Sequence, residues 1–333
     1  MNIFITGISG FLGSNLGHHL LKKGHNIYGN DNFIGGYKDN LSNKFNFYDV
    51  DCCNFNEMNN ILKNMEVVIH CAATAYEGFS VFSPSFVTKN IYEASVSTFS
   101  AAINNNVKKI IFCSSMARYG EQKYPFTEKM QTIPQDPYGI AKVAAEETLK
   151  NLCEVHNVDW TILVPHNIVG PRQKYDDPFR NVLSIFLNRM IRNKPAIIYG
   201  DGSQKRCFSH VNDCISCVEQ TITNAKTSRE IINIGPDEEF ITINELAEKC
   251  ANITGCNEKN IYYKDRPQEV KFATCSSDKA RKLIGYKTSF TLDEAIKSTY
   301  DYITKRGAKE FDYKFNIEIQ NEKTPETWKN KII

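Results

Sequence analysis

The eight residues "TGISGFLG", numbered 6 to 13, decide the fold of this chain. They follow the apolar run "NIFIT" and precede the helical pattern "SNLGHHLLKKG". Glycines at Gly7, Gly10 and Gly13 let the backbone turn tightly and approach a phosphate, to which a helix N-terminus offers unpaired N–H groups. The spacing is one residue wider at its start than Gly-x-Gly-x-x-Gly, so its setting between a strand and a helix carries the interpretation. The stretch predicts a dinucleotide-binding α/β fold.

Acidic residues end the next two predicted strands. Asp31, in "YGNDNF", stands eighteen residues after Gly13. A carboxylate at that place accepts hydrogen bonds from both hydroxyls of an adenosine ribose and repels a 2′-phosphate, which favours NAD over NADP. Asp51, in "DVDC", is expected beside the adenine.

Short β-branched runs alternate with helical patterns over the first two-thirds of the chain. This order predicts a parallel, doubly wound Rossmann sheet followed by a smaller C-terminal α/β lobe. We expect strands at residues 2–6, 25–31, 44–50, 66–72, 108–115 and 160–166. We assign residues 1–177 to the Rossmann domain, to which parts of 207–236 return, residues 178–305 mainly to the lobe, and residues 306–333 to a polar tail without a readable motif. The lobe is expected to open with a helix at 177–194 and a strand at 195–200.

The composition indicates a globular protein that acts on a small molecule. The 333 residues are 41% hydrophobic and 23% charged, and their interspersed charges sum to only +2, which disfavours a nucleic-acid or membrane-surface footprint. No apolar stretch approaches a membrane span, and the start "MNIFITG" lacks the pattern of a signal peptide. Eleven scattered cysteines fit reduced thiols in the cytoplasm, and Cys214 and Cys217 are interpreted as core residues. We identify no metal site.

The stretch "DPYGIAK", residues 136–142, predicts a helix start, with Asp136 as N-cap and Pro137 in the first turn. Tyr138 and Lys142 would then share one face near the positive end of the helix dipole, which would lower the pKa of the phenol. The same pattern fits an ordinary amphipathic helix with a surface Tyr and Lys, so the rest of the chain must decide between the two.

Further motifs in the chain favour the functional interpretation of Tyr138 and Lys142. These are "HCAA" at 70–73, "SSMARYG" at 114–120, "HNIVGPRQ", "GDGSQKRCFSHVND", "NIGPDEEFITINELA" and "DRPQEV" before "SSDKARKLIGY". With the glycine loop and the Tyr138–Lys142 pair, they resemble the extended short-chain dehydrogenase/reductase family. Within it the chain is similar to nucleotide-sugar 4-epimerases of the UDP-glucose 4-epimerase type. The resemblance covers roughly residues 1 to 302.

The resemblance implies a role for each residue of the motifs. Tyr138 would be the general base, titrating close to working pH with help from Lys142 and the nicotinamide ring, and Ser115 would relay the proton from the sugar. Arg206 and Arg266 would bind the nucleotide diphosphate, to which Asn167 would donate. Tyr199 would pack against the base, and Ala273 would line the sugar pocket. The NAD-binding residues would be Gly7, Gly10, Phe11, Leu12, Gly13, Asp31, Asn32, Asp51, Cys52, Ala72, Ala73, Asn90, Tyr138 and Lys142.

Several positions bear on the reaction and the sugar. Related dehydratases and decarboxylases carry an acidic pair after the catalytic Ser or Thr, whereas Met116 and Ala117 cannot transfer a proton. This favours epimerisation of a UDP-hexose. The small Ala273 leaves room for a 2-acetamido group. Tyr76 and Glu77 are expected to face the sugar, where Glu77 would repel a uronate.

Two rival functions stay open. One is a keto-sugar reductase or other nucleotide-sugar oxidoreductase, which would exchange its cofactor at each turnover, and the other is a catalytically silent dinucleotide-binding protein. The intact set Ser115, Tyr138 and Lys142 argues against the second. The resemblance also implies a homodimer, formed through a helix near residues 91–105 and the helix at 138–156.

Overall fold

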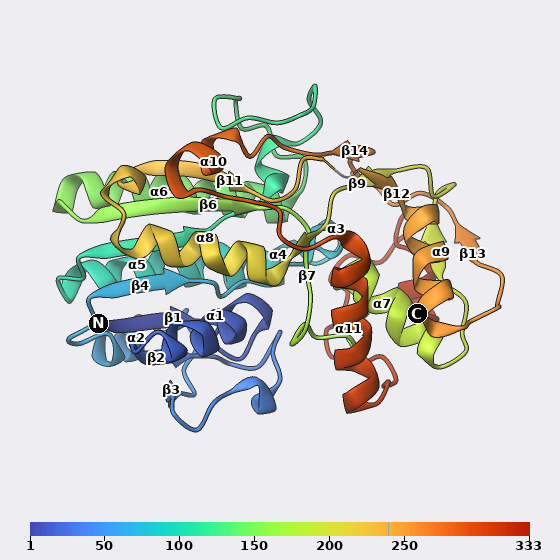
Figure 1. Ribbon diagram of the computed structural model, residues 1–333, viewed down its shortest axis with the longest axis horizontal. Helices are drawn as coiled ribbons and strands as arrows, with labels where there is room; N and C mark the ends of the chain where they lie inside the picture. Colours follow the sequence, from blue (N-terminus) through green and yellow to red (C-terminus); the bar gives the residue numbers. More distant parts are fainter. Residues whose placement is uncertain (239) are drawn as a thin grey trace.

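Seven parallel strands form the central sheet of the protein, whose computed structural model describes residues 1–238 and 240–333 (Figure 1). In sheet order they are β3 (Asn46–Tyr48), β2 (Asn26–Asn30), β1 (Asn2–Thr6), β4 (Val67–His70), β5 (Lys109–Cys113), β6 (Asp159–Pro165) and β11 (Glu230–Ile234). Every neighbouring pair is parallel. The six strands predicted from the N-terminal part all form, and the doubly wound Rossmann fold is confirmed.

Helices cover both faces of this sheet, because its buried strands point alternate side chains to opposite sides. Ile3 and Ile5 of β1 pack in one apolar cluster and Phe4 in the other. The first cluster includes residues of α1 (Phe11–Lys22), α8 (Val211–Thr223) and α10 (Asp278–Ile284). The second includes residues of α2 (Phe55–Ile61), α5 (Ala94–Asn104) and α6 (Pro137–His156). Cys214 and Cys217 are buried in α8, as predicted.

The smaller lobe lies at one end of the sheet, on the right of Figure 1. Its core is formed by α7 (Val182–Ile191), α9 (Ile243–Thr254) and α11 (Leu292–Arg306). Its short strands pair as β8 (Ile197–Tyr199) with β13 (Ile261–Tyr263), and as β9 (Lys205–Arg206) with β12 (Ile241–Thr242) and β14 (Phe272–Ala273). The strands β7 (Ile168–Val169) and β10 (Ser209–His210) form a further parallel pair.

Two helix starts differ from the sequence prediction. The first helix begins at Phe11, because Gly10 already serves as its N-cap. The helix expected at 177–194 begins only at Val182, because the side chain of Asn181 accepts a hydrogen bond from the Leu183 N–H at 3.0 Å. The residues before Asn181 therefore form a loop, which places Arg180 outside the helix.

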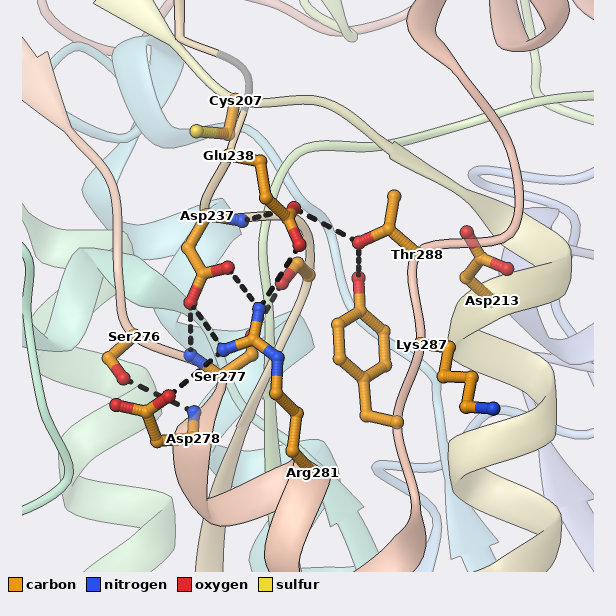
Figure 2. Close-up of polar contacts among 12 residues, drawn as sticks. Cys207, Asp213, Asp237, Glu238, Ser276, Ser277, Asp278, Arg281, Lys287 and Thr288 are labelled. Atoms are coloured by element: carbon orange, nitrogen blue, oxygen red, sulfur yellow. Dashed lines mark hydrogen bonds and ion pairs between the residues drawn. The ribbon is translucent and has the colours of Figure 1, made fainter.

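A polar network joins the start of α10 to the loop that follows β11 (Figure 2). Arg281 of α10 contacts Asp237 at 3.0 Å and Glu238 at 3.2 Å, both in the loop after β11. The Asp237 carboxylate also accepts the Ser277 N–H at 3.0 Å. Since β14 ends at Ala273, shortly before α10, this network helps to fix the position of β14.

The C-terminal tail packs along the junction between the Rossmann domain and the lobe. It ends with α12 (Glu326–Lys329), whose Trp328 is only 3% exposed. The indole lies 5.3 Å from the ring of Phe179 and 6.1 Å from that of Phe79, measured between centroids. Thr327 forms a hydrogen bond with the Tyr199 hydroxyl. The polar tail is thus part of the folded body, although its sequence carries no motif.

Candidate active site

The glycine loop adopts a conformation that side chains would prevent. Gly7 has φ +68°, and a Cβ there would lie 2.9 Å from the Ala72 Cα. A Cβ at Gly13 would lie 2.3 Å from the Gly7 carbonyl oxygen. Gly10, the N-cap of α1, has no side chain to cap the helix, so the first N–H groups of the helix stay available to an anion. This is the cradle that a pyrophosphate requires.

Asp31 stands at the end of β2 with its carboxylate fixed. One oxygen accepts the Ser9 N–H at 2.9 Å and the other accepts the Phe33 N–H at 2.7 Å. Burial raises the pKa of Asp31, and these hydrogen bonds oppose that shift. Each carboxylate oxygen keeps a further lone pair, so the residue can still accept from ribose hydroxyls.

A pocket beside the loop collects most of the predicted NAD-binding residues. It is lined by the predicted Gly7, Gly10, Asp31, Asn32, Asp51, Cys52, Ala72, Ala73 and Asn90. Phe11, Leu12, Gly13, Tyr138 and Lys142 lie outside this lining, the first three in the opening turn of α1 and the last two on α6. The lining also includes residues that the sequence did not indicate, namely Asn30, Ile34, Gly35, Val50, Cys71, Thr74, Ala94 and Arg180. The phosphate cradle and the fixed Asp31 carboxylate in one pocket fit an NAD molecule.

A second pocket brings together residues that are far apart in the sequence. Four of its lining residues were predicted to bind substrate: Ser115, Asn167, Arg206 and Ala273. Glu77, Met116, Ala117, Gly120, Phe126, Gln135, Asp136, Pro165 and Val270 complete it. We call it the sugar pocket. Tyr76, expected to face the sugar, is instead fully buried and donates its hydroxyl to Asp177 at 2.5 Å.

The remaining predicted substrate residues form a group of their own. The guanidinium of Arg266 lies 4.7 Å from the ring centroid of Tyr199. Arg266 pairs with Glu269 at 3.1 Å, and Arg206 lies 3.8 Å from the same carboxylate. Glu269 thus brings the two arginines together, although neither Arg266 nor Tyr199 lines the sugar pocket. Asn167 donates to the Cys207 carbonyl at 3.0 Å.

Tyr138 and Lys142 are both buried on α6, 7% and 3% exposed. The helix starts as predicted, since the Asp136 side chain accepts the Gly139 N–H at 2.8 Å. Burial raises the pKa of Tyr138, a hydrogen bond with Ser115 lowers it, and the carboxylate of Glu77 raises it again. The prediction that this helix position lowers the phenol pKa is therefore wrong for the protein residues by themselves, because burial is the largest influence and raises the pKa of Tyr138.

The ammonium group of Lys142 is buried at the end of β5. Its Nζ donates to the Cys113 carbonyl at 2.7 Å and lies 4.8 Å from the centroid of the Phe112 ring. Burial lowers the pKa of Lys142 to about 8. The sequence alternative of an ordinary surface Tyr and Lys is excluded, because both side chains are enclosed.

A buried ion pair supports the loop that carries Ser115. Arg118 and Glu146 meet at 2.9 Å, and Glu146 also accepts the hydroxyl of Ser114. Ser115 accepts the Ala117 N–H at 3.2 Å and so caps the short helix Met116–Tyr119. Sequence analysis missed this support, although the position of Glu146 one turn after Lys142 on the helix was a signal for it.

Two carboxyl groups line the sugar pocket. Asp136 is engaged in capping α6, and it also accepts the Ser80 hydroxyl at 3.4 Å. Glu77 keeps its side chain exposed to the cleft, although protein surrounds it on its other sides. This enclosure and the charge of Asp136 raise the pKa of Glu77 to about 7, with Arg206 and Arg266 opposing the shift. Glu77 faces the sugar pocket as expected.

In residues 1–238 and 240–333, no helix is long and apolar enough to cross a membrane, and no group of three or more His, Cys, Asp or Glu residues could hold a metal ion. All eleven cysteines are free of disulfides.

Comparison with known proteins agrees with this geometry. Residues 3–235 match the profile of the "NAD dependent epimerase/dehydratase family". A UDP-glucuronate 4-epimerase of Thermodesulfobacterium geofontis is 28% identical over 314 residues, which cover 90% of this chain and 94% of the relative.

Two crystal structures share the fold over nearly their whole length. The UDP-glucose 4-epimerase of Thermotoga maritima, solved with UDP-glucose, has a TM-score of 0.87 and 30% identity, covering 92% of this chain and 99% of the other. The UDP-glucuronic acid 4-epimerase of Bacillus cereus, solved with UDP-glucuronic acid and NAD, has a TM-score of 0.85 and 28% identity, covering 92% and 100%.

Proposed function

This chain belongs to the NAD dependent epimerase/dehydratase family, and we propose that it catalyses the 4-epimerisation of a UDP-hexose. The observation that carries the proposal is that Ser115, which forms a hydrogen bond with Tyr138, lines one pocket together with the diphosphate candidate Arg206. The relatives named above act on UDP-linked sugars, which supports uridine as the base.

The proposed chemistry starts at the phenol. Tyr138 takes the proton of the sugar 4-hydroxyl, with Ser115 as relay, and later returns it to the same oxygen. NAD held in the pocket beside the glycine loop would supply a hydride acceptor for C4 and a donor to its opposite face, and its positive ring would lower the phenol pKa. Lys142 adds positive charge beside the strand ends. In this proposal Asp31, Asp51 and the glycine loop hold the cofactor through each turnover.

Recognition of the substrate falls to the second pocket and the arginines beside it. Arg206 and Arg266 would bind the diphosphate through their planar guanidinium groups, with Asn167 donating to the same phosphates. Tyr199 would pack against the uracil. Ala273 leaves space beside the sugar, so glucose, galactose and their 2-acetamido derivatives are the proposed substrates.

The residues of the sugar pocket bear on whether the protein could instead be a nucleotide-sugar dehydratase. Met116 and Ala117 line it and cannot move a proton, which counts against dehydration. Glu77, however, is a carboxyl group that can carry a proton near neutral pH. It favours a nucleotide-sugar dehydratase as the second candidate.

One assay separates these functions. Purified protein without added cofactor is incubated with UDP-galactose, UDP-N-acetylgalactosamine and UDP-galacturonate, and the products are followed by NMR. We expect 4-epimers of the first two. A 4-keto-6-deoxy sugar would indicate the dehydratase, and a keto sugar formed with stoichiometric reduction of added NAD(P)+ would indicate the keto-sugar reductase running in reverse.

Homodimer formation is a further part of the proposal. Ile140 and Val155 on α6 are 55% and 65% exposed, so this helix presents apolar groups on its outer surface. Light scattering with size-exclusion chromatography would test it, and a monomeric mass would refute it.

A further inference from the structure

Arg180 lines the pocket beside the glycine loop, which we call the cofactor pocket, although it does not belong to the strands that carry this loop. Among the described residues that line this pocket, Asp31 and Asp51 are acidic and Arg180 is the one cation. Arg180 lies between β7 and α7, in the segment that leads from the Rossmann sheet to the smaller lobe. A pocket with two carboxylates and a dianionic ligand gains most from such a charge.

Glycines make room for the guanidinium at the pocket wall. A Cβ at Gly35 would collide with Nη2 of Arg180, and Gly35 itself lines the pocket. A Cβ at Gly36 would collide with Ser9 of the glycine loop. The pair Gly35–Gly36 therefore brings the Arg180 guanidinium and the phosphate cradle close to one another.

The other edge of the side chain is held by buried partners. Nε of Arg180 lies 3.4 Å from the Asp177 carboxylate, which also accepts the Tyr76 hydroxyl. The guanidinium carbon lies 4.7 Å from the centroid of the Tyr76 ring. The Asp177 contact is to Nε alone, so the Tyr76 ring and the place of Nη2 beside Gly35 keep the guanidinium at the pocket wall without it.

We infer that Arg180 binds the pyrophosphate of NAD. A guanidinium presents N–H groups in a planar fork that matches phosphate oxygens, whereas the glycine loop offers only backbone N–H groups. The cofactor would then be held by the segment that enters the substrate lobe as well as by the Rossmann domain. This inference rests on the proposed function only through its NAD cofactor.

The test measures cofactor exchange on the intact holoenzyme. Protein carrying labelled NAD is mixed with excess unlabelled NAD, and the release of label is followed for the wild type and Arg180→Gln. Loss of a charge-assisted contact predicts release at least about tenfold faster. Adenosine and ADP-ribose are then compared as competitors for rebinding. The advantage of ADP-ribose over adenosine is expected to fall about tenfold in the variant, because only ADP-ribose carries the pyrophosphate.

Two further variants separate binding from a structural role. Asp177→Asn removes the ion-pair partner but keeps the guanidinium, so NAD release is expected to stay as slow as in the wild type or slower. Arg192→Gln makes the same substitution at the C-cap of α7, where Arg192 donates to the Lys309 carbonyl at 3.1 Å, and is expected to leave release unchanged.

Wild-type release from Arg180→Gln would overturn the inference. So would an equal loss of affinity for adenosine and ADP-ribose, or equally fast release from Asp177→Asn, because either result would indicate a structural role. Retention of NAD by a wild type that shows no epimerisation would refute the proposed reaction and leave this inference standing.

Discussion

The cofactor pocket and the sugar pocket are assembled from different kinds of positions in the chain. The cofactor pocket follows the carboxyl ends of neighbouring strands, so its acidic residues and glycines have short, regular spacings in the sequence. The sugar pocket draws single residues from distant elements, including Glu77 from α3 (Glu77–Ser80), Arg206 from β9 and Ala273 from β14. The residues of the cofactor pocket can thus be predicted from local sequence spacing, whereas those of the sugar pocket are brought together only by tertiary packing.

The largest expected effect is at Tyr138, which forms a hydrogen bond with Ser115 of the sugar pocket. Tyr138→Phe removes the proton-transferring hydroxyl but keeps the buried ring, so we expect epimerisation to fall by about 10²–10⁴-fold. Bound NAD, measured after purification, should stay at the wild-type level. Tyr92→Phe, at a hydroxyl that contacts Thr148 at 3.2 Å, is the matched control and should keep full activity. A Tyr138→Phe enzyme with near-wild-type turnover would show that another group is the base.

The next effect belongs to the cofactor pocket alone. Gly13→Ala would place a methyl group 2.3 Å from the Gly7 carbonyl oxygen, so the loop backbone must shift. A strain of about 1–3 kcal/mol is expected to weaken NAD binding up to about 100-fold. Cofactor content after purification checks this. Gly24→Ala, just after the end of α1, is the control, because no atom lies within 4 Å of the added Cβ. Gly24 has a positive φ, so this variant should lose some stability and still retain NAD.

A smaller and more selective effect is expected in the sugar pocket. Ala273→Tyr fills the space proposed for a 2-acetamido group, and crowding of this kind costs about 1–3 kcal/mol. The ratio of kcat/KM for UDP-N-acetylgalactosamine to that for UDP-galactose should fall about 5- to 150-fold. Phe272→Tyr, at the exposed neighbouring residue, serves as the control. An unchanged ratio in Ala273→Tyr would mean that another residue bounds the sugar.

The smallest effect concerns pH. With its pKa raised to about 7 by enclosure and by Asp136, Glu77 is anionic above that pH and neutral below it. Repulsion of a uronate should therefore weaken as the pH falls, and turnover of UDP-galacturonate relative to UDP-galactose should rise severalfold between about pH 8 and pH 6. In Glu77→Gln the ratio should be higher at pH 8 and independent of pH. A wild-type ratio that does not change with pH would contradict this role.

The same contrast explains how much the sequence could predict. Strands, the helix start at Asp136 and the acidic residues of the cofactor pocket follow from local patterns, and the structure contains the predicted sheet. Arg180 was missed because the sequence pattern places it inside a helix, whereas the Asn181 cap leaves it in a loop.

Burial and long-range contacts account for the other differences. The pKa of Tyr138 depends on its enclosure, which no spacing of residues reveals. The sequence of the tail carries no motif, yet Trp328 packs edge-on against the stacked rings of Phe79 and Phe179. Such contacts join residues too far apart in sequence for any periodicity to report.

The most direct test of the proposed chemistry is epimerisation in D₂O. UDP-galactose is incubated with the purified protein in D₂O, and deuterium at C4 of the product is measured by NMR and mass spectrometry. Because the hydride removed from C4 is returned to the same carbon, the account predicts epimerisation to equilibrium with no deuterium at C4. Deuterium at C4 would contradict it, since the hydrogen would then have exchanged with solvent as a proton.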